Sequence, residues 1–363
     1  MLALLAVLAL AGCRGDDAPG PAPGPAPTPR PPTDEQQIGT LLDRRADRLG
    51  AEVSGLGVRD ARYAIEDLDV RRRSARVRAR LVYEVRGLEG EFGTQRTLVV
   101  RRERGRWKYT RTLGARAAEP WEVDDYRRER SAHFVVWAPE GVDAPTDALE
   151  AGYARLGAVL NGLERRYLVV VARDGDAARA ITREIEGLES LTAVTDTQVS
   201  VSGPALRVDA VRSQRLIVVA SAFASSPSPE QVITHELAHA VLAPRTSART
   251  PSWLNEGVAL FLSDDDRRAD YFTGYTAVPT LAGLAAPTAI GRLTGDAQAA
   301  GYATASAAAF YIADTYGEDA LLDLLAAFNQ RDVRGPAGDP LVTDRALRLV
   351  FGIGLRELQR RLG

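Results

Sequence analysis

The chain is poor in several residue types that commonly build functional sites. Its 363 residues include one cysteine, one methionine and three histidines. A single cysteine excludes an intrachain disulfide and a zinc cage built from thiolates. The formal net charge of −2 argues against nucleic-acid binding through bulk positive charge, so we expect no nucleic-acid partner.

Lysine is almost absent as well. Lys108 is the only lysine, so arginine supplies nearly all of the 46 basic residues. Together with the abundant alanine, this composition is typical of a GC-rich coding bias, which lowers the weight of any single arginine. Hydrophobic residues make up 45% and charged residues 26% of the chain, as is ordinary for a folded protein with a real core.

The single cysteine has an informative setting. Residues 1–12 form an apolar run that is too short to span a bilayer as a mature helix. The run resembles the hydrophobic part of a secretory signal, and the sequence LAGC that ends at Cys13 resembles the lipobox of bacterial lipoproteins. The resemblance implies that Cys13 is lipidated and anchors the protein to a bacterial membrane, at the cell surface or in a periplasm. The alternative is a free buried cysteine behind an apolar N-terminal helix.

The residues after Cys13 have the composition of a linker. Residues 14–33 are dominated by proline, glycine and alanine, so they cannot bury a core, and we expect an extended, semi-rigid tether. The sequence therefore divides into a signal peptide (1–13), this linker and two folded parts (34–115 and 121–363).

The first folded part has the pattern of a small α+β unit. Apolar residues at helical spacing predict a helix over residues 34–49, and alternating apolar residues predict a strand over residues 74–85. Two further strands follow, with a turn at Gly105. This order of elements resembles the NTF2-like cone domains.

Arginine is concentrated in this unit. Six of the ten residues from Arg71 to Arg80 are arginine. One hypothesis is an anion-binding strip that faces lipid head groups or wall polymers. The other, which the arginine-rich composition favours, is a solvated strand face.

From residue 121 onward the pattern changes to short apolar strands followed by helices. The predicted strands are 133–139, 167–174 and 215–223, with a helix over 148–163 between the first two. The later predicted helices cover residues 229–242, 251–262, 302–315, 318–329 and a terminal pair within 343–362. Strands first and helices later predict an α+β domain in which a mixed sheet packs against a helical half.

One predicted helix, with the sequence ITHELAHAVL, carries two of the three histidines. Its start is marked by Ser228 as N-cap, Pro229 at the first position and Gln231 in a capping box, and Pro244 stops it.

The spacing of polar residues on this helix predicts a metal site. His235 and His239 are four residues apart, so both imidazoles project from nearly the same face. This is the geometry for two nitrogen ligands of one tetrahedral zinc ion. Glu236 is rotated about 100° further round the helix, so it can flank the metal and take a proton from water there.

A catalytic zinc ion needs a third protein ligand and one open position. The better candidate is Glu256, in a second predicted helix that begins near Pro251 with Thr250 as its cap. The short connection of residues 243–249 lets the two helices pack as neighbours, so that Glu256 faces the histidines. We expect the remaining histidine, His133, to be structural.

The motifs HELAH and PSWLNEG together resemble the gluzincin metallopeptidases, in particular the peptidase-MA-like group related to thermolysin and the M1 aminopeptidases. The resemblance covers residues 121–363, although the motifs themselves are short. It implies that His235, His239 and Glu256 bind Zn²⁺ and that Glu236 is the general base and proton shuttle.

The same family uses a hydrogen-bond donor, often a tyrosine at the start of a later helix, to stabilise the oxyanion of the reaction. The segment GYATASAAAFYIADTYG resembles this element and implies that role for Tyr302. Tyr271 or Tyr275 could serve instead, and Tyr302 could also be an interface residue without a catalytic role.

One departure from the family narrows the expected activity. The M1 aminopeptidases carry a Gly-x-Met-Glu-Asn motif whose glutamate holds the amine of the substrate, whereas the strand before this helix reads RLIVVASAFASS. We therefore expect a metalloendopeptidase that binds a peptide or protein substrate along an edge strand at residues 215–223. The alternative is a catalytically silent envelope lipoprotein with a structural zinc site, used for binding or as a scaffold. The oligomeric state is left open.

Overall fold

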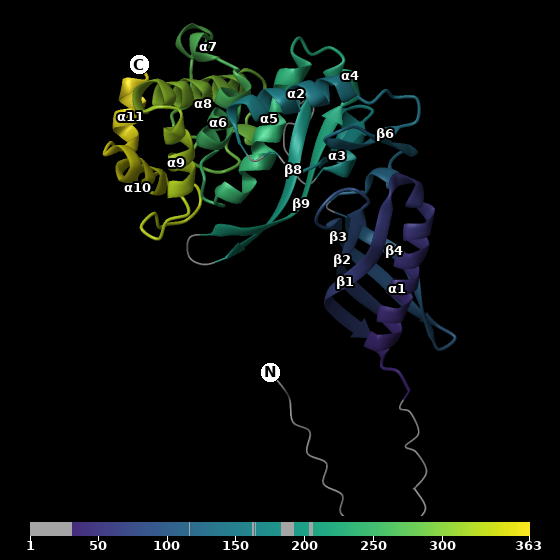
Figure 1. The fold of residues 1–363 in the computed structure, drawn as a ribbon. Helices are drawn as coiled ribbons and strands as arrows, with labels where there is room; N and C mark the ends of the chain where they lie inside the picture. Colours follow the sequence, from purple (N-terminus) through teal and green to yellow (C-terminus); the bar gives the residue numbers. More distant parts are fainter. Residues whose placement is uncertain (1–30, 116, 162, 164, 183–191, 203–205) are drawn as a thin grey trace, which may run out of the picture.

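The architecture is α+β, as the sequence predicts, with two sheets and a helical half (Figure 1). The computed structural model describes residues 31–115, 117–161, 163, 165–182, 192–202 and 206–363. Cys13 and nearly all of the linker lie outside these residues, so the lipid anchor stays a prediction. Every helix of the described part is too short or too polar to reach across a bilayer.

The first folded element is helix α1 (Asp34–Glu52), which confirms the predicted helix and extends it by a few residues. A capping box begins it, because Thr33 Oγ1 accepts a hydrogen bond from Gln36 N and the Gln36 side chain accepts one from Thr33 N. Its buried stripe packs on the first sheet and consists of Ile38, Leu42 and Ala46.

Four antiparallel strands follow α1 in the order β1-β2-β3-β4. Their bounds are β1 (Val58–Arg71), β2 (Ser74–Val85), β3 (Phe92–Glu103) and β4 (Arg106–Ala115). The predicted strand β2 and the turn at Gly105, whose φ is +80°, are confirmed. β1 was not predicted, because only Val58 and Tyr63 are buried along it and register shifts interrupt the alternation in its sequence.

The second sheet has five strands in the order β5-β6-β7-β9-β8, with three parallel strands inside and an antiparallel strand at each edge. The predicted mixed sheet is therefore confirmed. The strand bounds are β5 (Tyr126–Arg130), β6 (Phe134–Pro139), β7 (Tyr167–Ala172), β8 (Ala193–Ser202) and β9 (Arg207–Val219).

The strand expected at residues 215–223 differs from the observed one in two ways. It is β9, which begins earlier at Arg207, and residues 220–223 form the short helix α4 (Ala220–Phe223). From residue 215 to 218 it pairs with β7 on one side and β8 on the other, so it cannot receive a substrate as an edge strand. The edge strand is β8, whose mostly half-buried, polar sequence gave no clear signal.

The helical half confirms the predicted later helices and adds short ones. Helices α2 (Thr146–Val159) and α3 (Gly175–Ile181) lie within the sheet region, and the remaining helices are α5 (Pro229–Leu242), α6 (Ser252–Ser263), α7 (Arg268–Thr273), α8 (Gly295–Tyr316), α9 (Asp319–Ala327), α10 (Pro340–Phe351) and α11 (Leu355–Arg361). Because α8 begins at Gly295, Tyr302 lies about two turns inside it and not at its start.

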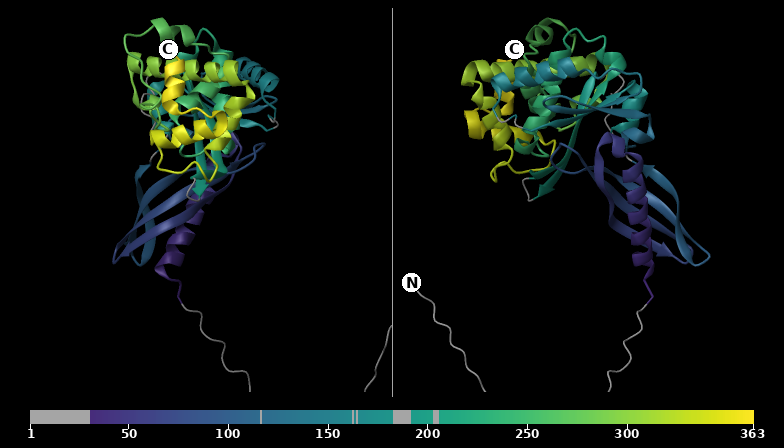
Figure 2. Two further views of the ribbon diagram at one scale, coloured as in Figure 1. Left: turned by 90° about the vertical axis from the view of Figure 1, so that its left-hand side faces the viewer. Right: turned by 45° about the vertical axis from the view of Figure 1, so that its right-hand side comes forward.

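The second sheet is covered on both faces (Figures 1 and 2). Phe134 and Val136 of β6 belong to a core shared with the helices, whereas Val135 and Trp137 belong to a core shared with α1 and the first sheet. Trp137 Nε1 also donates a hydrogen bond of 3.0 Å to the Leu56 carbonyl oxygen. The two folded parts of the chain therefore pack on each other through a common core.

A buried polar network crosses the boundary between the two sheets. Glu119 is fully buried and accepts hydrogen bonds from Tyr83 Oη at 2.8 Å and Thr94 Oγ1 at 3.0 Å. Arg215 of β9 lies 3.5 Å from the same carboxylate and donates from Nε to Asp196 at 3.0 Å. These partners compensate the cost of burying the charges and fix how the sheets pack.

Glu119→Ala should destabilise the protein strongly. It leaves the hydroxyls of Tyr83 and Thr94 without this acceptor and removes one carboxylate from buried Arg215. We expect the free energy of unfolding, measured by urea denaturation, to fall by about 3–5 kcal/mol. The same substitution at exposed Glu89 should change it by less than about 0.5 kcal/mol. Equal effects of the two substitutions would contradict a structural role for the network.

Candidate metal centre

Helix α5 carries the histidine motif, and its first turn is tied to the end of α6. Ser228 is the N-cap residue and Pro229 the first helical residue, as expected, but the Ser228 side chain makes no capping hydrogen bond. The predicted capping box is wrong, because Gln231 Nε2 donates instead to the carbonyl oxygens of Ser263 and Asp264. The start of α5 therefore lies beside the end of α6.

Helix α6 begins without the expected cap. Its N-cap residue is Pro251, and Thr250 Oγ1 accepts a hydrogen bond from Ser247 N instead of capping the helix. The turn before α6 is therefore stabilised within the connecting segment.

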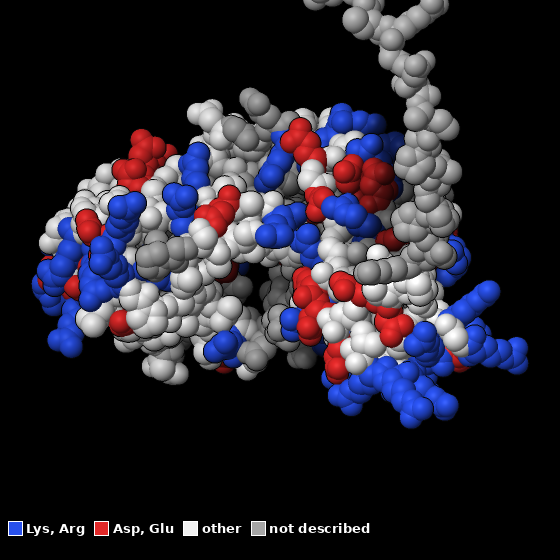
Figure 3. Space-filling model, turned by 90° about the horizontal axis from the view of Figure 1, so that it is seen from below, with Lys and Arg blue, Asp and Glu red and all other residues white. Residues whose placement is uncertain are grey.

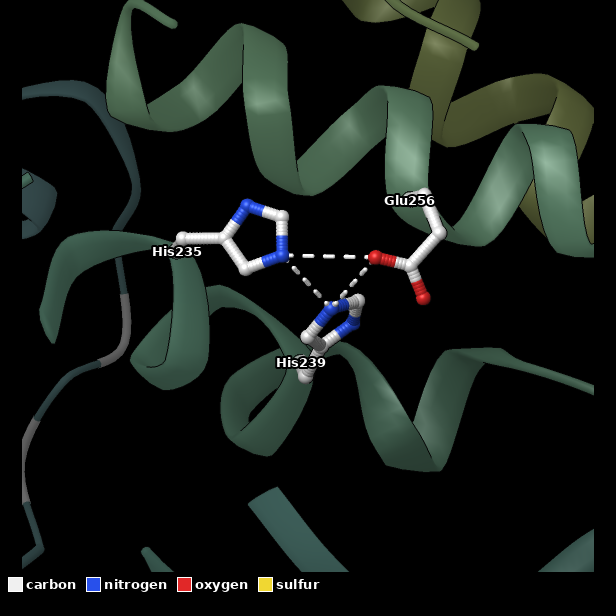
Figure 4. Close-up of side chains that lie close together, drawn as sticks. All are labelled: His235, His239 and Glu256. Atoms are coloured by element: carbon white, nitrogen blue, oxygen red, sulfur yellow. Dashed lines mark hydrogen bonds and ion pairs between the residues drawn. The ribbon is translucent and has the colours of Figure 1, made fainter. Parts of the chain in front are cut away.

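The structure brings the three predicted metal ligands together (Figure 4). His235 Nε2 and His239 Nε2 lie 3.1 Å apart. Glu256 Oε2 lies 3.3 Å from His235 Nε2 and 3.4 Å from His239 Nε2. The two imidazoles from α5 and the carboxylate from α6 therefore point toward one centre.

These separations fit a single tetrahedral ion. With bonds of about 2.0–2.1 Å, neighbouring ligands of a tetrahedral ion lie about 3.3–3.4 Å apart. The three measured distances are close to this value, and one tetrahedral position is left for a fourth ligand. The His235–His239–Glu256 group, which we call the metal centre, can hold a metal ion.

The electrostatics of the metal centre favour a positive charge. Burial lowers the pKa of His239, but the Glu256 carboxylate outweighs burial and raises this pKa to about 9. Burial likewise raises the pKa of Glu256, and the two histidines outweigh it and hold that pKa well below its usual range. The Glu256 carboxylate requires a positive charge nearby. Either a protonated imidazole or a bound metal cation can supply it.

Asn255 orients one of the ligands. Its carboxamide Nδ2 lies 3.3 Å from His239 Nδ1. For His239 Nε2 to bind a metal, Nδ1 must carry the hydrogen, and a turn of the carboxamide then places its oxygen as the acceptor. Asn255 stands in the WLNEG motif directly before Glu256, so one short segment supplies both a ligand and a support.

Glu236 is held at the edge of the metal centre by a residue that the sequence did not single out. Thr195 Oγ1 lies 2.7 Å from both the backbone oxygen and Oε2 of Glu236. The hydroxyl has one hydrogen, so it donates to one of these atoms at a time. Thr195 belongs to β8, and the only signal for it was a weak alternation in the sequence AVTDTQVSVS.

Two cavities flank the metal centre. One of about 610 Å³ extends toward the first turn of α5, and the other, of about 320 Å³, extends toward its last turn. Both have Ala193, His235, Glu236 and Tyr302 in their walls. Because the two cavities share these wall residues, they adjoin each other at the metal centre, and a long ligand can extend into both.

Of the three candidate tyrosines, the structure brings Tyr302 to the metal centre. Tyr302 lines both cavities, whereas Tyr271 and Tyr275 line neither. Burial raises the pKa of Tyr302 well above its usual value, and the carboxylates of Glu256 and Glu236 raise it further. The Tyr302 hydroxyl therefore keeps its proton and is available as a donor.

An arginine that the sequence did not mark stands in the wall of the larger cavity. Arg267 pairs with Asp265 at 2.7 Å, and its guanidinium carbon lies 5.7 Å from the ring centroid of Tyr302. This side of the metal centre therefore carries a fixed cation that Asp265 partly neutralises.

His133 belongs to a different part of the fold. Its Nδ1 lies 2.6 Å from Glu150 Oε2, and its ring stacks on Tyr153 with centroids 3.8 Å apart. These contacts agree with the structural role expected for it.

The glycine of the WLNEG motif has a packing role. A Cβ atom on Gly257 would lie 2.6 Å from the Ala305 carbonyl oxygen and 3.0 Å from Ala309 Cβ. Only glycine lets α6 approach α8 so closely, and this approach brings Tyr302 of α8 next to Glu256 of α6.

The geometry defines a class of site: two histidines from one helix, a glutamate from its neighbour and a second glutamate beside them. Comparison of the chain with protein-family profiles, with curated proteins and with solved structures finds no match. The resemblance to the gluzincins therefore rests on the two motifs HELAH and PSWLNEG.

Gly257→Ala should weaken both the fold and the metal centre. The added methyl group forces α6 and α8 apart, so we expect the free energy of unfolding to fall by about 1–3 kcal/mol. We also expect the metal affinity to fall, because Glu256 is displaced. Urea denaturation and competition with a metal chelator measure the two effects.

A matched control is available in α1, where Gly39 has open space around its Cβ position. Gly39→Ala should keep the metal affinity and leave the stability equal or raise it by up to about 1 kcal/mol. Identical behaviour of the two variants would show that helix approach at Gly257 does not position the ligands.

Proposed function

We propose that this protein is a zinc-dependent endopeptidase of the gluzincin type that acts at the bacterial cell envelope. The observation that carries the proposal is the position of Glu236. Its carboxylate is held by Thr195 at the edge of the metal centre and lines both flanking cavities. A protein that only binds a metal requires the three ligands but has no need of this fourth group.

The donor set favours zinc. Two imidazoles and one carboxylate at tetrahedral separations, with one position open, are typical of catalytic zinc sites. A zinc ion held by these side chains supplies a Lewis acid that polarises a carbonyl oxygen and makes water more acidic.

The protein's own residues perform the proton transfers. Glu236 accepts the proton that water loses as it attacks the scissile carbonyl, and then donates it to the departing amine. Thr195 fixes the orientation of the carboxylate for both steps. Tyr302 donates a hydrogen bond to the carbonyl oxygen as that oxygen gains negative charge.

Strand β8 offers a binding site for the peptide backbone. It is an edge strand, so one side of its backbone has no partner strand among the described residues. Residues 193–195 and 197 of β8 line the smaller cavity beside His235 and His239. An extended peptide that pairs with β8 would thus lie across the metal centre. This strand replaces residues 215–223, which the sequence predicted as the edge strand and which the structure places mostly inside the sheet.

The two cavities favour cleavage inside a peptide. Space extends on both sides of the shared wall residues, so a substrate can continue in both directions from the scissile bond. This agrees with the absence of the amine-anchoring motif from the strand before α5.

The proposed location rests on the segment of the chain that precedes the first folded part. The resemblance of the LAGC segment to a lipobox supports lipidation at Cys13 and a membrane-bound peptidase. The helix and curved sheet of residues 34–115 support an NTF2-like module between the anchor and the peptidase part.

Glu236→Gln tests the proposal directly. The amide keeps the shape of the side chain but cannot take up a proton, so we expect cleavage of internally quenched peptides to fall by about 10²–10⁴-fold. Zinc content, measured by elemental analysis, should stay at about one ion per chain because the three ligands are intact.

Glu230→Gln is the matched control, since Glu230 lies on the same helix and outside both cavities. It should keep full activity. Full activity in Glu236→Gln would refute the assigned base. A wild-type protein that holds one zinc ion and cleaves no peptide would favour the alternative, a silent scaffold lipoprotein.

A further inference from the structure

The first sheet ends in two neighbouring hairpin turns. β1 and β2 are joined at Arg72 and Arg73, and β3 and β4 are joined at Arg104 and Gly105. Arg102 N donates a hydrogen bond of 2.9 Å to the Arg73 carbonyl oxygen, so the turns lie side by side at one end of the sheet. Side chains of both turns therefore share one surface.

Basic side chains dominate this end, which we call the basic tip. The basic tip consists of Arg71, Arg72, Arg73, Arg101, Arg102, Arg104, Arg106 and Lys108, all of them exposed. Figure 3 views the molecule from this end and shows long basic side chains projecting into solvent at the lower right.

Acidic side chains neutralise only part of the basic tip. The pairs are Arg71 with Asp69, Arg102 with Asp34, and Lys108 with Glu103. For the other five cations, the described residues place no carboxylate oxygen within 4.0 Å. The basic tip therefore presents a positive field to solvent, although the chain as a whole has a net charge of −2.

The turn conformation does not account for these arginines. Arg104 has a φ of +48° and Gly105 a φ of +80°, which is the backbone of a turn that favours asparagine, aspartate or glycine at its first position. An arginine there is locally unfavourable. The coding bias explains arginine in place of lysine, but not why eight basic residues gather at two adjacent turns.

The chain also enters the fold at the basic tip. Asp34, the first residue of α1, accepts a hydrogen bond of 3.0 Å from Trp107 Nε1 and pairs with Arg102 at 3.4 Å. Residues 14–33 separate this point from Cys13, a length on the order of 60–70 Å when fully extended. Figures 1 and 2 show this end projecting away from the helical half. The basic tip is therefore the end of the fold at which a tether from Cys13 enters.

We propose that the basic tip docks on the anionic phospholipid headgroups of the membrane. Each arginine close to an anionic surface strengthens binding roughly fivefold. Lipid anchors commonly need such a second signal for stable attachment. Docking by this end turns the helical half and its metal centre away from the bilayer. The proposal is independent of the peptidase activity, because the basic tip and the metal centre share no residue.

A vesicle-binding assay tests the proposal on a chain of residues 14–363, which retains every described element and lacks the lipid and the apolar leader. The protein should sediment with phosphatidylcholine vesicles that contain about 30 mol% phosphatidylglycerol and not with pure phosphatidylcholine. Because the attraction is screened by ions, raising the salt from about 0.1 M to about 0.5 M should release it.

A triple variant assigns the binding to the basic tip. Arg72→Gln, Arg73→Gln and Arg104→Asn together should weaken binding to the anionic vesicles at least about tenfold. The control removes the same charge from the opposite half of the molecule with Arg292→Gln, Arg331→Gln and Arg356→Gln, all exposed. It should bind within about twofold of the unmodified chain, because these positions lie away from the basic tip.

Three results would overturn the proposal. The first is equal binding to neutral and anionic vesicles, and the second is equal weakening by the two triple variants. The third is tighter binding to a DNA duplex than to the anionic vesicles, which would assign the basic tip to nucleic acid. Urea denaturation of each variant confirms that the fold is intact.

Discussion

Three donor atoms held within 3.4 Å of one another are the constraint on which the rest of the site depends. Two imidazoles and a half-buried carboxylate favour a shared positive charge, and their separations match those around one tetrahedral ion. Helices α5 and α6 are placed to satisfy this arrangement. Gln231 joins the start of α5 to the end of α6, and Gly257 lets α8 approach from the other side.

The second sheet connects this site to the remainder of the molecule. One of its faces packs on the helices that carry the ligands, and the other packs on the first sheet. Its edge strand β8 supplies Thr195, which holds Glu236, and the neighbouring β9 supplies Arg215 of the buried polar network. The metal centre and the basic tip thus lie in opposite parts of one connected body (Figure 1).

Local sequence signals predicted much of this fold. Helix α5 is confirmed at both ends, and β2 is confirmed residue for residue, because strong periodicity and clear punctuation mark them. Spacing also predicted that His235 and His239 point to one side of α5, since residues four apart on a helix share a face. β1, β5, β8 and α7 were missed because their sequences are polar or short. The expected capping box of α5 was wrong because Gln231 bonds to residues at the end of α6, and the expected cap of α6 was wrong because Thr250 bonds to Ser247 nearby in the chain.

Contacts between residues far apart in the chain could not be predicted from local sequence patterns. Nothing local shows that β9 lies inside the sheet or that Thr195 reaches Glu236, because both depend on strand order. The placement of Tyr302 followed from a resemblance, and its position beside the ligands depends on the close packing at Gly257. The basic tip likewise arises from two turns that meet only in the folded sheet.

The most direct test of the central account is anomalous X-ray scattering at the zinc edge from crystals grown with zinc. The account predicts one strong peak about 2.0–2.2 Å from His235 Nε2, His239 Nε2 and a Glu256 carboxylate oxygen. A fully loaded crystal with no peak between these three atoms, or with its peak elsewhere in the molecule, would contradict it.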